Sequence, residues 1–112
     1  MKTNYIKQIK IEYWKEIIKI NEELLVNSAV WCPSCLILNK NLKKLKSEYP
    51  ELTIKKLDYD LDEDEVEKYD IGTKLPVMII KKDNKEINRL IGEKTYEETI
   101  AFLKEGNLIW RK

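Results

Sequence analysis

The chain has 112 residues, 43% of them hydrophobic, a size and composition that predict one domain over residues 1–112 around a single packed core. Its 21 basic and 20 acidic residues leave a net charge of +1, which argues against a nucleic-acid-binding protein. Residues 1–20 break every apolar run with Lys, Gln or Glu, and no segment has the apolar length of a membrane span. We therefore expect a cytoplasmic monomer without a secretory signal or a membrane anchor.

Strand and helix patterns alternate at the start of the chain. Residues 5–9 alternate apolar and polar side chains, which predicts an edge strand. Apolar residues then recur at helical spacing and predict a short helix over about residues 12–20. Residues 24–30 are mostly apolar, with β-branched members, and Cys-Pro follows shortly after. This pattern is typical of a buried central strand.

A second helix is predicted to begin inside the motif VWCPSCL, residues 30–36. Proline is favoured at the first helical position and disfavours helical geometry in the residue before it. Cys32 is therefore predicted as the N-cap and Pro33 as the first helical residue. From Cys35 onward, apolar residues recur every three or four positions until a second proline ends the helix. The Lys-rich stretch 39–46 is expected to form the solvent-facing side of this helix.

The next two elements follow the same alternation. Residues 52–57 predict a third strand, and residues 62–69 predict a short helix. Asp62 and Glu65 form an Asp-x-x-Glu variant of the capping box at the start of that helix.

A hairpin and a last helix close the predicted fold. Residues 76–80 and 86–91 predict two strands, joined by a turn at residues 83–84. Thr95 and Glu98 form a capping box for the last helix, which Gly106 is expected to end. The order β-α-β-α-β-α-β-β-α predicts parallel pairing among the first three strands and an antiparallel pair for the last two.

The two cysteines lie only two residues apart, and three interpretations compete. A disulfide across so small a loop would stabilise the fold little. In a reducing compartment, a lone CxxC is more often catalytic or metal-binding. The chain has no histidine and no other cysteine, so a four-ligand zinc site would need carboxylates or a second subunit. We therefore expect no metal and favour a redox pair.

The predicted helix start assigns different roles to the two thiols. Unpaired N–H groups and the helix dipole favour negative charge at Cys32, so we expect it to be the exposed nucleophile. Cys35 follows on the apolar face one turn later and is expected to be the shielded resolving thiol.

From residue 22 onward, the chain resembles the thioredoxin family. Trp31-Cys32-x-x-Cys35 matches the family's WCxxC, and LTIKKLDYD resembles its third strand, with Lys56 at the position of the strand lysine. LPV resembles the segment that carries the family's cis-proline, and IKKDNKEINRLIG resembles the closing hairpin with its glycine, Gly92. The resemblance implies an α/β fold: a three-layer α/β/α sandwich with a central mixed sheet of about five strands and four helices.

The resemblance also implies the activity. It implies a protein-disulfide reductase in cell redox homeostasis that needs no cofactor. Its partners would be protein disulfides and an electron donor of the thioredoxin-reductase type. Pro76 would be cis and would place the Leu75 backbone beside the cysteines, where an extended substrate segment can add as a strand. The substrate-binding residues would be Trp31, Pro33, Leu75, Pro76 and Gly92, with Trp31 in a flat apolar surface beside Leu75 and Ile91 or Gly92.

Several residues depart from the family pattern. Val26 stands where the family has a buried aspartate, so another group would have to accept the proton of Cys35. Asp58 is the nearest candidate, although a solvated residue at the strand end is the simpler interpretation. Lys56 is expected either to favour the thiolate or to extend into solvent. The Pro-Ser dipeptide keeps glutaredoxin-like and isomerase-like exchange open, and a redox-inactive adaptor is a further alternative.

Overall fold

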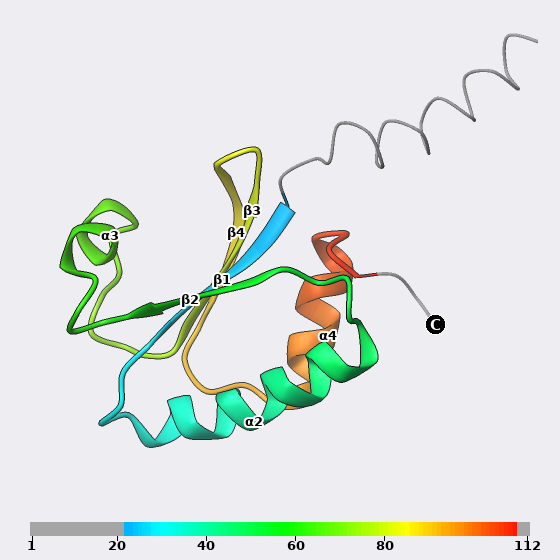
Figure 1. Cartoon of the computed structure of the whole chain (residues 1–112), viewed down its shortest axis with the longest axis horizontal. Coiled ribbons are helices and arrows are strands. Elements are labelled where there is room, and N and C mark those ends of the chain that lie inside the picture. Colours follow the sequence, from blue (N-terminus) through cyan, green and yellow to red (C-terminus); the bar gives the residue numbers. More distant parts are fainter. Residues whose placement is uncertain (1–21, 110–112) are drawn as a thin grey trace, which may run out of the picture.

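The computed structural model describes residues 22–109, which form a four-stranded sheet and three helices (Figure 1). The elements in chain order are β1 (Glu22–Ser28), α2 (Pro33–Glu48), β2 (Ile54–Asp58), α3 (Glu63–Lys68), β3 (Val77–Lys82), β4 (Lys85–Ile91) and α4 (Tyr96–Glu105). The strand predicted at residues 5–9 and the helix predicted at about 12–20 lie outside the described residues. For this reason the described part has one strand and one helix fewer than the predicted five and four.

The sheet is mixed, as predicted, with the strand order β2-β1-β3-β4. β1 pairs in parallel with β2 and antiparallel with β3, and β3 pairs antiparallel with β4. The predicted parallel pairing is thus confirmed for the two strands that the structure describes, as is the closing hairpin. β1 begins two residues before the predicted strand, and β3 begins at Val77, immediately after Pro76.

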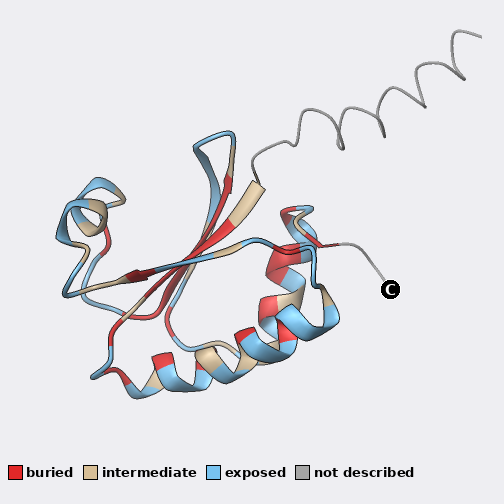
Figure 2. Ribbon diagram, viewed as in Figure 1, coloured by how far each residue is buried: buried red, intermediate tan, exposed pale blue. Residues whose placement is uncertain are grey.

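Hydrophobic clusters cover both faces of the sheet, because successive side chains of a strand point to opposite sides. Leu24 and Val26 of β1 belong to a cluster that includes side chains of α2 and α4. Leu25 belongs to a second cluster, which contains both cysteines and against which Val66 of α3 packs. Helices α2 and α4 lie on one side of the sheet and α3 on the other (Figure 1), with the buried residues along the central strands (Figure 2). This is the predicted three-layer arrangement.

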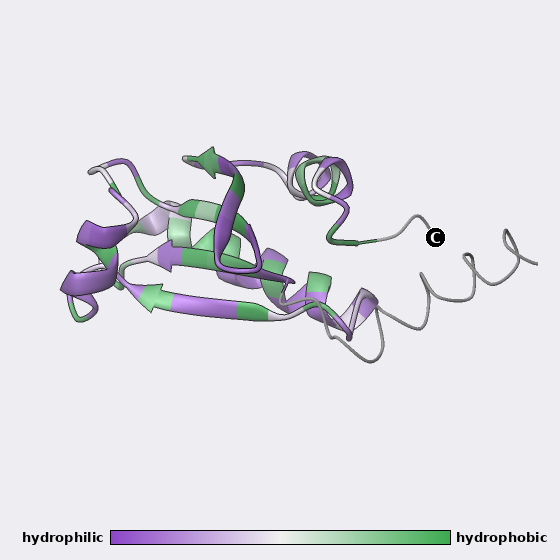
Figure 3. Ribbon diagram, turned by 90° about the horizontal axis from the view of Figure 1, so that it is seen from above, coloured by the Kyte–Doolittle hydropathy of each residue, from purple (hydrophilic) through white to green (hydrophobic). Residues whose placement is uncertain are grey.

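Helix α2 lies with its apolar face against the sheet. Leu38, Leu42 and Leu45 are buried, whereas the lysines at 40, 43, 44 and 46 are exposed. Figure 3 shows both hydrophobic and hydrophilic residues in α4, which also packs against the sheet. The prediction that the Lys-rich stretch is a solvent-facing helix surface is therefore confirmed.

The predicted hairpin turn and one of the two predicted capping boxes are present, whereas the other capping box is not. The predicted turn is present, with Asp83 at φ 53° and Asn84 at φ 66°, and the Thr95–Glu98 capping box forms with both of its hydrogen bonds. The capping box predicted at Asp62 is wrong, since its side chain makes no capping bond to α3. Its Oδ2 atom instead accepts a hydrogen bond from the Asp58 N–H at 2.7 Å, so the preceding turn occupies the carboxylate.

Candidate active site

The cysteine pair lies where the chain leaves β1 and enters α2. Cys32 is the N-cap of α2, with extended backbone angles, and Pro33 opens the helix, both as predicted. The N–H of Cys35 donates to Cys32 Sγ at 3.3 Å and to the Cys32 carbonyl at 3.1 Å. The sulfur therefore takes the place that a Ser or Asp oxygen usually has at an N-cap. The sulfur thus accepts one of the N–H groups at the helix end, which it shares with the Cys32 carbonyl.

Both thiols are free and both residues are buried, which corrects the expectation for Cys32. Cys35 is 1% exposed, as expected for a shielded thiol, but Cys32 is only 6% exposed rather than open to solvent. There are two reasons: the Cys32 sulfur turns inward to accept the Cys35 N–H, and Ile71 and Leu75 from distant segments belong to the same buried cluster.

Burial raises the pKa of the Cys35 thiol to about 11. A hydrogen bond with the side chain of Cys32 and the nearby charge of that group contribute to this raised pKa, while a hydrogen bond with the Ala29 backbone opposes it. Burial is the main cause because it removes water that would stabilise the thiolate. At neutral pH, Cys35 is therefore a thiol that must lose its proton before it can attack.

The segment before β3 lies beside the cysteines, as the resemblance implied. The Leu75–Pro76 peptide bond is cis, and Leu75 belongs to the same buried cluster as Cys32 and Cys35. The Gly92 N–H donates to the Pro76 carbonyl at 2.8 Å. Gly92 has φ 91°, and a β-carbon there would lie 3.1 Å from Lys74 Cε, so both backbone and space favour glycine.

Trp31 forms an exposed surface next to the first cysteine. Its side chain is 58% exposed, and Val30 and Ile91 are also exposed. Leu75 is only 8% exposed, so its side chain is not part of the flat surface that was predicted with Trp31. The Trp31 indole contacts Tyr59 edge-to-face, with ring centroids 6.2 Å apart, and its Nε1–H donates to Asp60 Oδ2 at 2.8 Å.

A second carboxylate reaches the motif from the other half of the chain. The Ser34 hydroxyl, between the two cysteines, donates to Glu93 Oε1 at 2.8 Å. Neither Asp60 nor Glu93 was singled out from the sequence. Their positions offered one signal: Asp60 follows shortly after the end of a predicted strand, and Glu93 follows the predicted hairpin glycine.

Lys56 and Asp58, the residues predicted to assist proton transfer, both lie on β2. Val26 is fully buried and opposite Lys56 in the β1–β2 register, and Lys56 is exposed, in agreement with the solvent-facing interpretation. Asp58 ends β2, and its Oδ1 atom accepts the N–H groups of Asp60 and Leu61 at 2.9 and 3.0 Å. That oxygen therefore holds the turn after β2.

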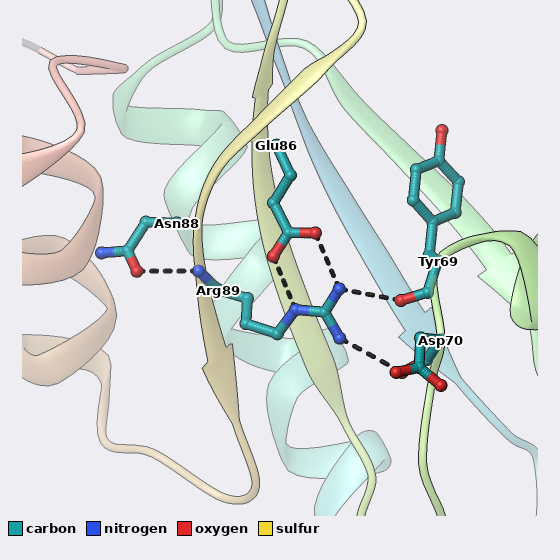
Figure 4. Close-up of polar contacts among 5 residues, drawn as sticks. All are labelled: Tyr69, Asp70, Glu86, Asn88 and Arg89. Atoms are coloured by element: carbon teal, nitrogen blue, oxygen red, sulfur yellow. Dashed lines mark hydrogen bonds and ion pairs between the residues drawn. The ribbon is translucent and has the colours of Figure 1, made fainter.

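An arginine of β4 holds the turn that leads from α3 to the cis-proline. The Arg89 guanidinium binds both carboxylate oxygens of Glu86, at 2.6 and 2.7 Å (Figure 4). It also donates to the Tyr69 carbonyl at 2.8 Å and to the Asp70 carbonyl at 3.4 Å. The guanidinium thus ties the end of α3 to the edge of the sheet, at the start of the loop that carries Pro76.

Within residues 22–109, no three Cys, His, Asp or Glu side chains come together as a group that could hold a metal ion. In the same part of the chain, no helix combines the length and the apolar character that crossing a membrane requires.

Comparison with known proteins identifies the family of the chain. The thioredoxin family model matches residues 5–105. Thioredoxin of Chlamydia trachomatis is 34% identical over 77 residues, 69% of this chain and 74% of that protein. The X-ray structure of Fasciola hepatica thioredoxin has a TM-score of 0.71 at 24% identity, over 88% of this chain and 92% of that one. A thioredoxin f2 solved in complex with ferredoxin:thioredoxin reductase has a TM-score of 0.67 at 26% identity, over 77% of each chain.

A CxxC pair at a helix N-terminus, a cis-proline beside it and these relatives lead to one conclusion. The chain belongs to the thioredoxin family and is a thiol–disulfide oxidoreductase.

Proposed function

We propose that this chain reduces disulfide bonds of partner proteins, with Cys32 as the attacking thiolate and Cys35 as the resolving thiol. The observation that carries the proposal is the N-cap geometry: Cys32 Sγ accepts the N–H of Cys35 at 3.3 Å, at the positive end of a 16-residue helix. Negative charge on this sulfur gains from the helix dipole and from the hydrogen bond.

The reaction then needs two exchanges of the same kind. The Cys32 thiolate attacks one sulfur of the partner disulfide, a mixed disulfide forms, and the partner's other sulfur leaves as a thiolate that takes up a proton. Cys35 loses its proton and attacks Cys32 Sγ, which closes the Cys32–Cys35 bond and releases the second partner thiolate. Two electrons pass from the dithiol to the partner, and an external dithiol donor must reduce the new disulfide.

The proposed contact surface for the partner surrounds Cys32. Trp31 and Pro33 are exposed on either side of it, and the Leu75 backbone before the cis-proline offers an extended segment a place to pair. Gly92, whose N–H donates a hydrogen bond to the Pro76 carbonyl, has no β-carbon that would project beside the cis-proline. The role of Pro33 is to open the helix directly after the nucleophile and to keep the turn rigid.

The donor and the compartment are part of the proposal. A related thioredoxin f2 was solved in complex with ferredoxin:thioredoxin reductase, which supports a dedicated reductase as the electron donor here. A reducing cytoplasm suits a pair that must be returned to the dithiol form after each turnover.

A trapping experiment tests the assignment of the two thiols. The Cys35→Ser variant can form the mixed disulfide but cannot resolve it, so it should accumulate covalently with a model disulfide protein in a ratio of one to one. The matched Cys32→Ser variant should not form this species. Trapping by Cys32→Ser but not by Cys35→Ser would reverse the roles, and trapping by neither would reject the proposal.

A further inference from the structure

Negative charge is concentrated on the side of the molecule that carries the nucleophile. Residues 58–70 contain eight acidic residues and one basic residue, although the whole chain has a net charge of +1. Part of this segment lines an open groove of about 500 Å³, bounded by Tyr59, Asp60, Glu63, Val66, Glu67, Asp70 and Ile71. The groove adjoins the active site because Tyr59 contacts the Trp31 ring and Asp60 accepts its N–H.

Two carboxylates are held directly against the redox motif. Asp60 binds Trp31, the residue before the first cysteine, at 2.8 Å, and Glu93 binds Ser34, between the cysteines, also at 2.8 Å. The two acids come from different loops, 29 and 59 residues away from their partners. A partner segment that reaches Cys32 therefore meets a positioned carboxylate next to each of these motif residues.

Neither carboxylate is paired with a cationic side chain in the part of the chain that the structure describes. Each accepts a hydrogen bond from a neutral donor, an indole N–H or a hydroxyl. The salt bridges among residues 22–109 join Lys82 to Glu22 and Arg89 to Glu86, so neither Asp60 nor Glu93 takes part in one. The Lys74 side chain packs against Gly92 without an ion pair to Glu93. A cation supplied by the partner would find two acceptors already oriented.

We infer that Asp60 and Glu93 determine substrate specificity: they select partner disulfides flanked by Lys or Arg and disfavour acidic ones. The inference rests on the proposed function, whose substrate class it names. Opposite charges across a contact raise the association rate, and like charges lower it. Hydrogen bonds to Trp31 and Ser34 hold the carboxylates in place, so little further ordering is needed on binding. Glutathione disulfide, which carries negative charge, belongs to the disfavoured class.

Two disulfide peptides test this inference. They have the same length and the same disulfide loop, flanked by two lysines in one and by two glutamates in the other. The full-length protein reduces each with dithiothreitol as the electron donor, and kcat/KM is corrected for direct reduction by dithiothreitol. Exposed ion pairs each contribute only modestly to binding, so we expect a preference of about three- to tenfold for the lysine peptide at low salt. At 1 M salt, where the Debye length is about 3 Å, the preference should disappear.

Amide variants separate charge from hydrogen bonding. Asp60→Asn and Glu93→Gln keep an oxygen acceptor for Trp31 and Ser34 but remove the charge, so each should reduce the preference about two- to threefold, and the double variant should abolish it. Glu51→Gln is the matched control: Glu51 is exposed and lies beyond the far end of α2, about 24 Å along the helix axis from its start. It should retain the full preference.

The outcomes distinguish this inference from the proposed function. Equal kcat/KM for the two peptides, or a preference that survives in the double variant, would overturn the specificity role while leaving the reductase activity in place. Reduction of neither peptide would reject the proposed function, and the specificity inference with it.

Discussion

Val26 of β1 lies directly opposite Lys56 of β2, and the two side chains share the face of the sheet that α2 covers. Val26 is fully buried and packs in the same cluster as Leu38 and Leu42 of that helix. The position where the resemblance to the family implies a buried aspartate is therefore filled by hydrocarbon. Any proton from Cys35 has to leave by another route.

Restoring a carboxylate at this position should accelerate resolution. We expect Val26→Asp to raise the rate of mixed-disulfide resolution by about tenfold or more, since a positioned general base typically contributes at least that much. The buried charge should lower the free energy of unfolding by about 3 kcal/mol. Quenched-flow measurement of the resolving step provides the test, with Val26→Asn as a control that is polar but cannot take up a proton. A folded Val26→Asp protein with an unchanged rate would contradict the prediction.

The raised pKa of Cys35 predicts a steep pH dependence of the same step. Because the thiol has a pKa of about 11, its thiolate fraction should rise almost tenfold per pH unit between pH 7 and pH 10. We expect burial, the main cause of the shift, to remain while Cys32 is in the mixed disulfide, because it does not depend on a free Cys32 thiol. Stopped-flow resolution rates across this range check the slope. A rate that levels off near pH 8 would mean that another group takes the proton of Cys35.

The Arg89–Glu86 pair should stabilise the fold in a pH-dependent way. The hydrogen bond from Arg89 holds the pKa of Glu86 below its ordinary value of 4.5. A carboxyl with a lowered folded-state pKa contributes stability above 4.5 that is lost as the pH falls through the lowered value. Measured by urea unfolding between pH 6 and pH 3, the free energy of unfolding should thus fall less steeply with decreasing pH for Glu86→Gln than for the native chain. Glu105→Gln, at the exposed end of α4, should behave like the native chain.

Removing the arginine itself should loosen the loop before Pro76. Arg89→Ala deletes charge-assisted bonds to Glu86 and two carbonyl bonds, which we expect to lower the free energy of unfolding by about 1–3 kcal/mol. Ile71, whose N–H donates to the Val66 carbonyl, and Gly106, at the end of α4, provide the two amides to compare. Relative to the native chain, Arg89→Ala should accelerate hydrogen exchange more at Ile71 than at Gly106. Uniform acceleration at both sites would show only a global loss of stability.

A buried amide gives a prediction of opposite sign. Asn27 is 1% exposed, and neither its Oδ1 nor its Nδ2 atom has a hydrogen-bond partner among residues 22–109. It lies opposite Leu57 and Val77, two members of the cysteine-bearing cluster. Asn27→Leu should therefore raise the free energy of unfolding by about 1–3 kcal/mol, measured by urea denaturation. A destabilised Asn27→Leu protein would show that the amide is paired in solution.

The elements around the cysteines could be predicted because their signals are local. Cys32 and Pro33 mark a helix start within two residues, Asp83-Asn84 forms a turn between adjacent strands, and Thr95 with Glu98 closes a capping box within one helical turn. In each case the residues that interact are neighbours in the chain. The cysteine pair itself, with its nucleophile placed at a helix end, is a signal of the same range.

The surroundings of that pair were decided by the tertiary structure. Asp60 reaches Trp31 and Glu93 reaches Ser34 across separations of 29 and 59 residues, which no periodic pattern encodes. Cys32 is buried because its sulfur turns toward a backbone N–H of α2 and because other segments pack around it. The local sequence thus determines where the thiols stand, whereas burial and charge at the site depend on distant segments that only the folded chain brings together.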